Sequence, residues 1–348
     1  MYTTEPIEAP LSDEFACDIN AFENALMQEL DPLVLPMPVS MTKAYASMHD
    51  PHEVVASFAA RAPDGRVVGT AWMSAPTKDN PHIAFVRMGV AAGHRRSGIG
   101  TALLRAYVDF AAQHDRTSLL FGADLFHPSG QAFADSLGAT VAMRAHVNQL
   151  VLSDLPDGLV QHWIATAHSA TGAVHDYELL WVPDNEYPDE WVADLMAVSD
   201  VLHNDAPMED IPVGERQTTA DQIRAQGARA SAFGREYWTL IAKHRATGEP
   251  VGYTEMLFPS EDPKLASQGA TAVSGKHRGY ALGRWLKATM LERVMAERPE
   301  VACIRTFNAD SNDPMLAINF AMGFKNLYPA CRWLIERQDA ETWLEKRT

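Results

Sequence analysis

The sequence predicts an α/β fold with a mixed sheet, and it predicts this fold twice along the chain. Two observations lead to that conclusion. The 348-residue chain contains an internal repeat at a long, fixed spacing, and each copy shows strand and helix patterns in the same order. A chain of this length also exceeds what one hydrophobic core usually serves, which favours two domains.

The repeat is carried by turn residues that keep their register. Gly69 corresponds to Gly252, and Pro76 to Pro259, both at a spacing of 183 residues (252 − 69 and 259 − 76). The same spacing relates three further pairs: Val90 with Val273, Arg95 with Arg278, and Gly100 with Gly283. Gly138 corresponds to Gly323 at a spacing of 185 (323 − 138), which indicates a two-residue insertion in a loop. Chance explains a register of this length poorly.

Each copy predicts a meander of three strands, a glycine-rich turn, a helix, a strand and a short helix. In the first copy, two strands flank the Asp64-Gly65 turn, and a final glycine ends the last helix. The predicted elements of that copy are 54–61, 67–75, 83–90, 101–114, 118–124 and 129–137. Those of the second copy are 237–244, 251–258, 270–273, 284–297, 302–308 and 314–322. We expect domains at 1–154 and 175–348, joined by a connector at 155–174, with a short polar helix near 339–346.

Composition excludes several classes of function. A net charge of −16 argues against general nucleic-acid binding, because that function needs a basic surface. No run reaches about 18 apolar residues, and the acidic first residues do not resemble a secretory signal, so we expect no membrane partner. The three cysteines lack CxxC spacing and no HExxH motif occurs, which predicts a cytoplasmic protein without a metal.

The turn after the third strand carries the strongest functional signal. It reads VAAGHRRSGIG at 90–100 and VSGKHRGYALG at 273–283, and a helix follows in both copies. Small residues let backbone N–H groups approach a pyrophosphate, the helix N-terminus favours an anion, and arginine supplies charge-assisted hydrogen bonds. A Rossmann fingerprint fails because Leu103 and Leu286 stand where its third glycine is needed, and the Gly-Lys-Ser/Thr of a P-loop is absent. The remaining alternative is a glycine turn that only starts a helix, which the second occurrence disfavours.

The pattern Val-x-x-x-His-Arg-x-x-Gly/Ala-x-Gly resembles the acyl-CoA pyrophosphate loop of the GNAT superfamily. The meander before it and the strand and helix after it are also similar, over most of residues 40–150 and 175–335. The two-copy arrangement resembles tandem actinobacterial proteins of the mycothiol-synthase type. The resemblance implies two tandem domains, each with a mostly antiparallel central sheet flanked by helices. It also implies that acyl-CoA inserts at a V-shaped opening between the third strand and the next.

The resemblance further implies a donor, an acceptor and a set of binding residues. The donor would be acetyl-CoA, and the acceptor a primary amine of a small molecule that attacks the thioester directly in a ternary complex. The implied cofactor-binding residues of the first copy are Val90, Arg95, Arg96, Gly98, Ile99, Gly100 and Thr101. Those of the second copy are Val273, Arg278, Ala281, Leu282, Gly283 and Arg284, with Asn312 eleven residues before Gly323.

The two copies depart from the family pattern in different ways. The position of Asn312 is held by His127 in the first copy. Many members carry a tyrosine four residues before the last glycine, where it protonates the departing thiolate. Here Ala134 and Asn319 stand at that position, so water or Tyr280 in the second turn would have to supply the proton.

Glu255 is the second candidate catalytic residue. It lies in a predicted strand, where glutamate is uncommon and costly to bury unpaired, and Trp72 is its counterpart in the first copy. Glu255 is either a general base for the amine or a member of a structural ion pair. Because the second copy combines Glu255 with Asn312, we expect it to be the catalytic domain. Two alternatives stay open: a non-catalytic acyl-CoA-binding or regulatory protein, and transfer of a larger acyl group.

Overall fold

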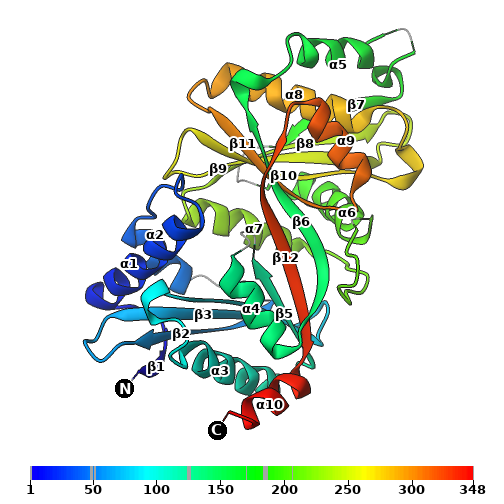
Figure 1. Cartoon of the computed structure of the whole chain (residues 1–348). Helices are drawn as coiled ribbons and strands as arrows, with labels where there is room; N and C mark the ends of the chain where they lie inside the picture. The colour runs from blue at the N-terminus through cyan, green and yellow to red at the C-terminus, as the bar shows by residue number, and fades with distance from the viewer. Residues whose placement is uncertain are drawn as a thin grey trace. The chain divides into compact units, whose positions relative to one another are not determined.

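The computed structural model shown in Figure 1 describes residues 2–47, 50, 52–123, 127–169, 171–182, 187–205 and 207–347. Its chain forms two compact units. Unit 1 consists of Met1–Arg144, Glu209–Gly214 and Pro329–Thr348, and unit 2 of Ala145–Met208 and Glu215–Tyr328. These units differ from the predicted domain ranges in three places: residues 145–154 lie in unit 2, and residues 209–214 and 329–348 lie in unit 1.

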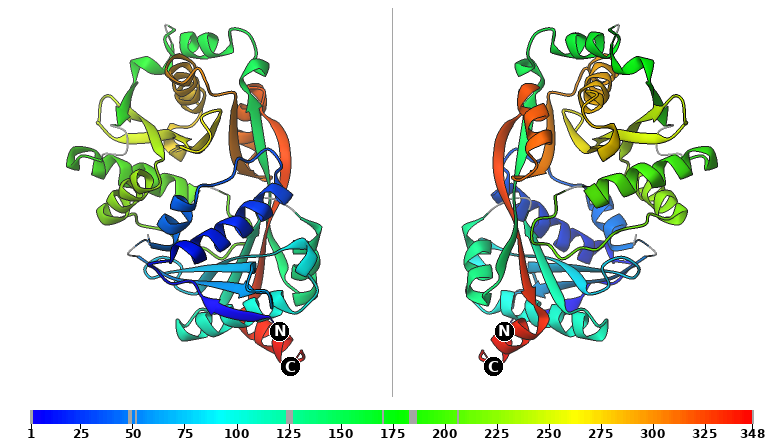
Figure 2. Two further views of the ribbon diagram at one scale, coloured as in Figure 1. Left: turned by 90° about the vertical axis from the view of Figure 1, so that its left-hand side faces the viewer. Right: turned by 90° about the vertical axis from the view of Figure 1, so that its right-hand side faces the viewer.

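Unit 1 is a sheet with helices on both faces, in the strand order β1-β2-β3-β4-β5-β12. Its strands are β1 (Thr3–Pro6), β2 (Glu53–Arg61), β3 (Val67–Pro76), β4 (Ile83–Val90), β5 (Ser118–Ala123) and β12 (Lys325–Glu336). Its helices are α1 (Asp13–Leu30), α2 (Val39–Ser47), η1 (Ala92–His94), α3 (Ile99–Gln113), α4 (Pro128–Leu137) and α10 (Arg337–Glu345). Figure 2 shows α1 on one face of β2, β3 and β4 and α3 on the other. The strand predicted at 118–124 is confirmed to Ala123; its last residue lies outside the described part of the chain.

Unit 2 repeats this arrangement in the order β6-β11-β10-β9-β8-β7. Its strands are β6 (Thr140–Val151), β7 (Tyr177–Val182), β8 (Glu236–His244), β9 (Pro250–Phe258), β10 (Leu265–Val273) and β11 (Cys303–Ala309). Its helices are η2 (Leu152–Asp154), α5 (Leu159–Ala167), η3 (Ala173–His175), α6 (Asp189–Asp205), α7 (Ala220–Ala232), η4 (Gly275–His277), α8 (Leu282–Glu297) and α9 (Asp313–Ala321). One core lies between the sheet and α8, and a second lies under α6 and α7. The predicted mixed, mostly antiparallel α/β fold is therefore confirmed.

The sheet of each unit is completed by a strand from the other copy of the repeat. In unit 1, β12 pairs antiparallel with β5 from Cys331 opposite Ala123 to Glu336 opposite Ser118. In unit 2, β6 pairs antiparallel with β11 from Ala145 opposite Ala309 to Val151 opposite Cys303. Figure 1 shows these pairs as the red β12 beside the teal β5 and the green β6 beside the orange β11. Each core therefore needs both halves of the sequence.

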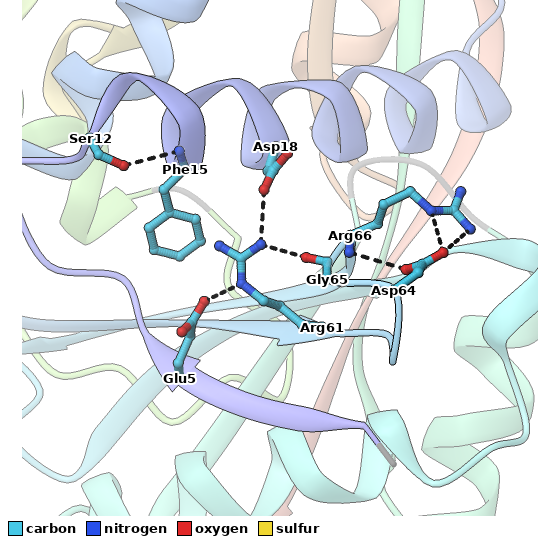
Figure 3. A network of polar contacts seen from close by, with 8 residues as sticks. All are labelled: Glu5, Ser12, Phe15, Asp18, Arg61, Asp64, Gly65 and Arg66. Atoms are coloured by element: carbon cyan, nitrogen blue, oxygen red, sulfur yellow. Dashed lines mark hydrogen bonds and ion pairs between the residues drawn. The ribbon is translucent and has the colours of Figure 1, made fainter.

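Arg61 joins the first elements of unit 1 (Figure 3). Its Nε donates to Glu5 of β1 at 2.5 Å, and its Nη1 donates to Asp18 of α1 at 2.8 Å. The same Nη1 donates to the carbonyl of Gly65 at 2.6 Å, and the guanidinium lies 4.6 Å from the centre of the Phe15 ring. One half-buried cation thus fixes α1 against the hairpin that leads to the candidate site.

Candidate active site

The two predicted anion loops share an unusual backbone. In unit 1, Arg96 and Gly98 have φ of 62° and 89°; in unit 2, the matching Gly279 and Ala281 have φ of 91° and 58°. Each loop thus places left-handed residues at the same two positions but uses glycine at only one of them. Because a left-handed non-glycine residue costs of order 1 kcal/mol, the shared shape is maintained against local preference.

Both loops end on a helix whose first amides are free to bind an anion. The first N–H groups of a helix have no intrahelical acceptor, and they belong here to Ile99, Gly100 and Thr101 in α3. In α8 they belong to Leu282, Gly283 and Arg284. Exposed loop residues precede both helices. The structure therefore brings these predicted residues together in each unit as an array of backbone donors.

The side chains of Arg95 and Arg278 contact the protein itself at both ends of the guanidinium group. The Nε of each donates at 3.0 Å to the carbonyl of the last strand residue, Val90 or Val273. Their guanidinium groups form ion pairs with helices on the face of the sheet opposite to α3 and α8. Arg95 pairs with Glu29 of α1 at 2.8 Å, and Arg278 pairs with Asp205 of α6 at 2.9 Å. Both charges are thus partly neutralised, and these side chains brace the loops. The sequence showed the repeated arginine but gave no sign of its carboxylate partner.

The strands beside each loop diverge, as the predicted V-shaped opening requires. In unit 1, β4 pairs in parallel with β5 from Ile83 to Val86, and its residues from there to Val90 have no pairing on this side with any described residue. In unit 2, β10 pairs with β11 only from Leu265 to Ser267 and continues to Val273. The backbone groups on these edges are available to an inserted chain.

A β-bulge distinguishes unit 2 from unit 1. The pairing of β10 with β9 shifts by one residue between Gln268 and Thr271, whereas β4 pairs with β3 without a shift from Gly69 to Ser74. A bulge leaves backbone groups outside the ladder and re-aims side chains, often beside an active site. The glycine inside the strand, Gly269, was a signal for this bulge that the sequence analysis did not use.

Glu255 lies directly against the bulge. Its Oε2 would be 3.2 Å from a Cβ placed on Gly269, and its carboxyl accepts a hydrogen bond from the Ala270 backbone N–H. Part of the residue remains exposed, but the strands enclose the carboxyl, and this loss of solvation raises the pKa of Glu255 to about 7. No ion pair to Glu255 occurs among the described residues. The carboxyl therefore changes protonation near neutral pH, the range in which general-base catalysis is most efficient.

Polar groups that sequence reasoning missed lie on the same face as Glu255. Thr239 is directly opposite on β8, 1% exposed, and its Oγ1 lacks a hydrogen-bond partner within the described chain. Tyr253 lies two residues before Glu255 on the same face; burial, and then the charge of Glu255, raise its pKa. Only the folded register of β8 and β9 brings these groups together.

The structure does not bring Tyr280 to this group. Its side chain is 53% exposed on the loop before α8, and its ring lies 5.7 Å from that of Tyr177. Asn312 stands at the start of α9, and its side chain makes no capping hydrogen bond. His127 caps α4 instead by accepting from the Ser129 N–H at 3.2 Å. The two copies therefore differ at the start of the last helix both in the residue present and in whether its side chain caps the helix.

Among the described residues, no group of three or more histidine, cysteine, aspartate or glutamate side chains is placed to hold a metal ion. No helix within that part of the chain is long and apolar enough to span a membrane.

Comparison with known proteins supports the geometry described above. Residues 20–138 match the profile of the acetyltransferase (GNAT) family. A tandem GNAT protein from the clavulanic acid biosynthesis pathway, in a structure without AcCoA, is 27% identical with a TM-score of 0.76; the match covers 97% of this chain and 99% of that one. No match was found among curated protein sequences.

More distant structures share the fold alone. A GCN5-related N-acetyltransferase from Sphaerobacter thermophilus is 13% identical with a TM-score of 0.64, covering 97% of this chain and 96% of that one. A glucosamine N-acetyltransferase region of a fungal multi-domain β-N-acetylglucosaminidase is 12% identical with a TM-score of 0.63, covering 95% and 38%. The chain is thus a tandem GNAT-fold protein, as the sequence predicts. Its first copy matches a family whose chemistry is acyl transfer from acyl-CoA.

Proposed function

We propose that the chain is a cytoplasmic N-acyltransferase that moves an acyl group, acetyl in the simplest case, from acyl-CoA to a primary amine of a small molecule. The observation that carries this proposal is the bulge of β10 with Glu255 against it, beside a loop of free helix amides. Unit 1 has the loop, but its matching strand β4 pairs with β3 without a bulge, and Trp72 replaces the glutamate. We therefore assign the reaction to unit 2.

The donor would be held by the backbone. The N–H groups at Leu282, Gly283 and Arg284 bind the pyrophosphate, and the unpaired edge of β10 near Val273 binds the arm that follows. A backbone N–H on this edge polarises the thioester carbonyl. Ala281 shapes the loop, and Arg278 braces it from behind.

Glu255 would act on the acceptor. Above its pKa of about 7 the carboxylate accepts a proton from the ammonium group, which frees the nitrogen lone pair for attack on the thioester carbonyl. The tetrahedral intermediate collapses to the amide and expels the CoA thiolate, which takes up a proton. Holding amine and thioester together supplies much of the acceleration, and no covalent enzyme intermediate is needed.

The source of the thiolate proton is testable at Tyr280. If its hydroxyl donates the proton, Tyr280→Phe lowers kcat by about 10- to 100-fold. Its exposed position beside the anion loop supports a second role, stacking on the adenine of CoA, in which case Tyr280→Phe leaves kcat unchanged and Tyr280→Ala raises the Kd for CoA.

The function is tested by titrating acetyl-CoA calorimetrically into the protein and measuring CoA release with pooled primary amines. Binding together with amine-dependent release supports the proposal. Binding without release from any amine favours the rival function, a non-catalytic acyl-CoA-binding or regulatory protein, which the absence of tyrosine at Ala134 and Asn319 supports.

A further inference from the structure

The interior of unit 2 is polar at positions where the interior of unit 1 is apolar. The repeat spacing and the strand register define which positions of the two units correspond. The buried residues of unit 2 are Thr254, Gln268, Lys287, Thr306, Asn319 and Asn148. Their counterparts in unit 1 are, in the same order, Ala71, Val86, Leu104, Phe121, Ala134 and Trp333, all members of its hydrophobic core. We call the six unit 2 residues, together with Asn308, the polar set.

The polar set has unsatisfied hydrogen-bonding capacity. Asn308 Oδ1 accepts from Asn319 Nδ2 at 2.9 Å and from Asn148 Nδ2 at 3.3 Å. The Oδ1 atoms of Asn148 and Asn319 are buried and have no partner in the described part of the chain, although both residues are 0% exposed. Buried polar atoms are nearly always paired, so each unpaired one requires a specific reason.

Lys287 adds a buried cation without a counter-charge. It is 1% exposed on α8, and its Nζ lies 5.8 Å from the centre of the Phe324 ring. Burial is the one cause that lowers its pKa to about 7, and no ion pair to Lys287 exists among the described residues. Burying an ammonium group without a counter-charge destabilises the folded state, and Leu104 at the matching position of unit 1 shows that the fold accepts an apolar residue here.

The polar set lies where the donor's acyl end is expected. Gln268 and Thr306 are the first residues beyond Ser267 and Arg305, the last pair before β10 and β11 diverge. Lys287 is one helical turn beyond Gly283, the last glycine of the anion loop. A chain that enters along β10 from this loop ends at the polar set.

We propose that unit 2 takes an acyl-CoA whose short acyl group ends in a carboxylate, with Lys287 as the counter-charge and the asparagine amides as hydrogen-bond partners. This inference rests on the proposed function and names its donor class. A carboxylate supplies the missing negative charge, and rotated amide groups of Asn148 and Asn319 can present N–H donors to it. A simple acetyl group would leave the ammonium unpaired.

Succinyl-CoA and butyryl-CoA test whether unit 2 prefers a terminal carboxylate. Both acyl groups have four carbons, but the succinyl group ends in a carboxylate and the butyryl group in a methyl. Calorimetric titrations in a Gly100→Glu background isolate the loop of unit 2. We expect at least tenfold tighter binding of succinyl-CoA than butyryl-CoA. Lys287→Met should remove this preference and Asn319→Ala weaken it, while Lys264→Met, which removes an exposed lysine of the same unit, should preserve it.

Proton uptake gives a second readout. At pH 8 free Lys287 is mostly neutral, and a bound carboxylate raises its pKa, so binding should take up close to one proton. Lys287→Met should take up none. Equal or tighter binding of butyryl-CoA, or a succinyl preference that survives in Lys287→Met, overturns this inference alone. Failure to bind any acyl-CoA, acetyl-CoA included, overturns the proposed function with it.

Discussion

The backbone N–H of Ala270 donates a hydrogen bond to the carboxyl of Glu255 across a bulge that the second copy has and the first lacks. This contact lowers the pKa of the carboxyl, but the larger effect of burial raises it to about 7. The group is thus neither a permanently charged surface carboxylate nor a permanently protonated one. Its titration connects the fold of the sheet to the proposed chemistry.

The first prediction concerns the pH dependence of turnover. Because the base works deprotonated, kcat/KM should rise with pH, pass half its maximum near pH 7 and then level off. Glu255→Gln should lower kcat by about 10²- to 10⁴-fold and abolish this rise. Glu249→Gln, at an exposed position just before β9, is the matched control. A full rate in Glu255→Gln would assign Glu255 a structural role only.

The same pKa predicts how stability changes with pH. A carboxyl whose folded pKa lies above its unfolded value of 4.5 binds its proton more tightly in the folded state. The protonated Glu255 carboxyl therefore adds to the free energy of unfolding at low pH, and this contribution is lost as pH rises from about 4.5 to 7. Glu255→Gln should raise the free energy of unfolding at pH 8, by up to about 3 kcal/mol, and change it little at pH 4. Urea melts at the two pH values measure this; equal shifts at both would contradict it.

A third prediction concerns the clamp at Arg61. Arg61→Met removes hydrogen bonds to Glu5, Asp18 and the Gly65 carbonyl, and it leaves two carboxylates without their cation. We expect a loss of about 1–3 kcal/mol in the free energy of unfolding. Arg66→Met is the control. The Arg66 side chain is 71% exposed and, among the described residues, forms an ion pair with Asp64 alone, so the free energy of unfolding should change by no more than about 0.5 kcal/mol. Similar losses in both variants would refute the clamp.

A fourth prediction follows from the strand exchange. A chain that ends at Tyr328 loses the strand that pairs with β5, together with the core residues Trp333, Ile335 and Leu344. Amide hydrogen exchange should show lost protection in α3 and β5 but preserved protection in α8. A chain that ends at Glu345 should exchange like the full protein. Intact protection of β5 in the shorter chain would mean that the first copy completes its own sheet.

The sequence could predict the repeat, the mixed sheet and both anion loops because these features are local. A turn such as Asp64-Gly65 and the spacing from Val90 to Gly100 are readable in one stretch of chain. The strand exchange is not local. Residues 145–151 and 329–336 occupy the same position in the two copies, and buried residues alternate along both strands. The burial pattern of either strand therefore suits both sheets. Pairing of this kind is decided only when the whole chain folds.

The candidate site could be predicted in part for the same reason. Glu255 was recognisable because a glutamate inside a strand is unusual, and the glycines of the loops marked the anion site. The partners of Arg95 and Arg278 come from helices far away in the sequence, so their bracing role had no local signal. The polar set was equally hidden, because each member is an ordinary residue and only the matched positions of the other unit show the contrast.

The most direct test of the account compares Gly283→Glu with Gly100→Glu. The glutamate places a negative charge in the anion loop and so excludes the pyrophosphate. Gly283→Glu blocks the loop of unit 2, and Gly100→Glu blocks the loop of unit 1. Acyl-CoA titration and amine-dependent CoA release are measured on both variants, with circular dichroism as the control for folding. The account predicts that Gly283→Glu removes one binding site and all turnover, while Gly100→Glu leaves turnover intact. Turnover that survives Gly283→Glu and disappears in Gly100→Glu would place the reaction in unit 1 and contradict the role assigned to Glu255.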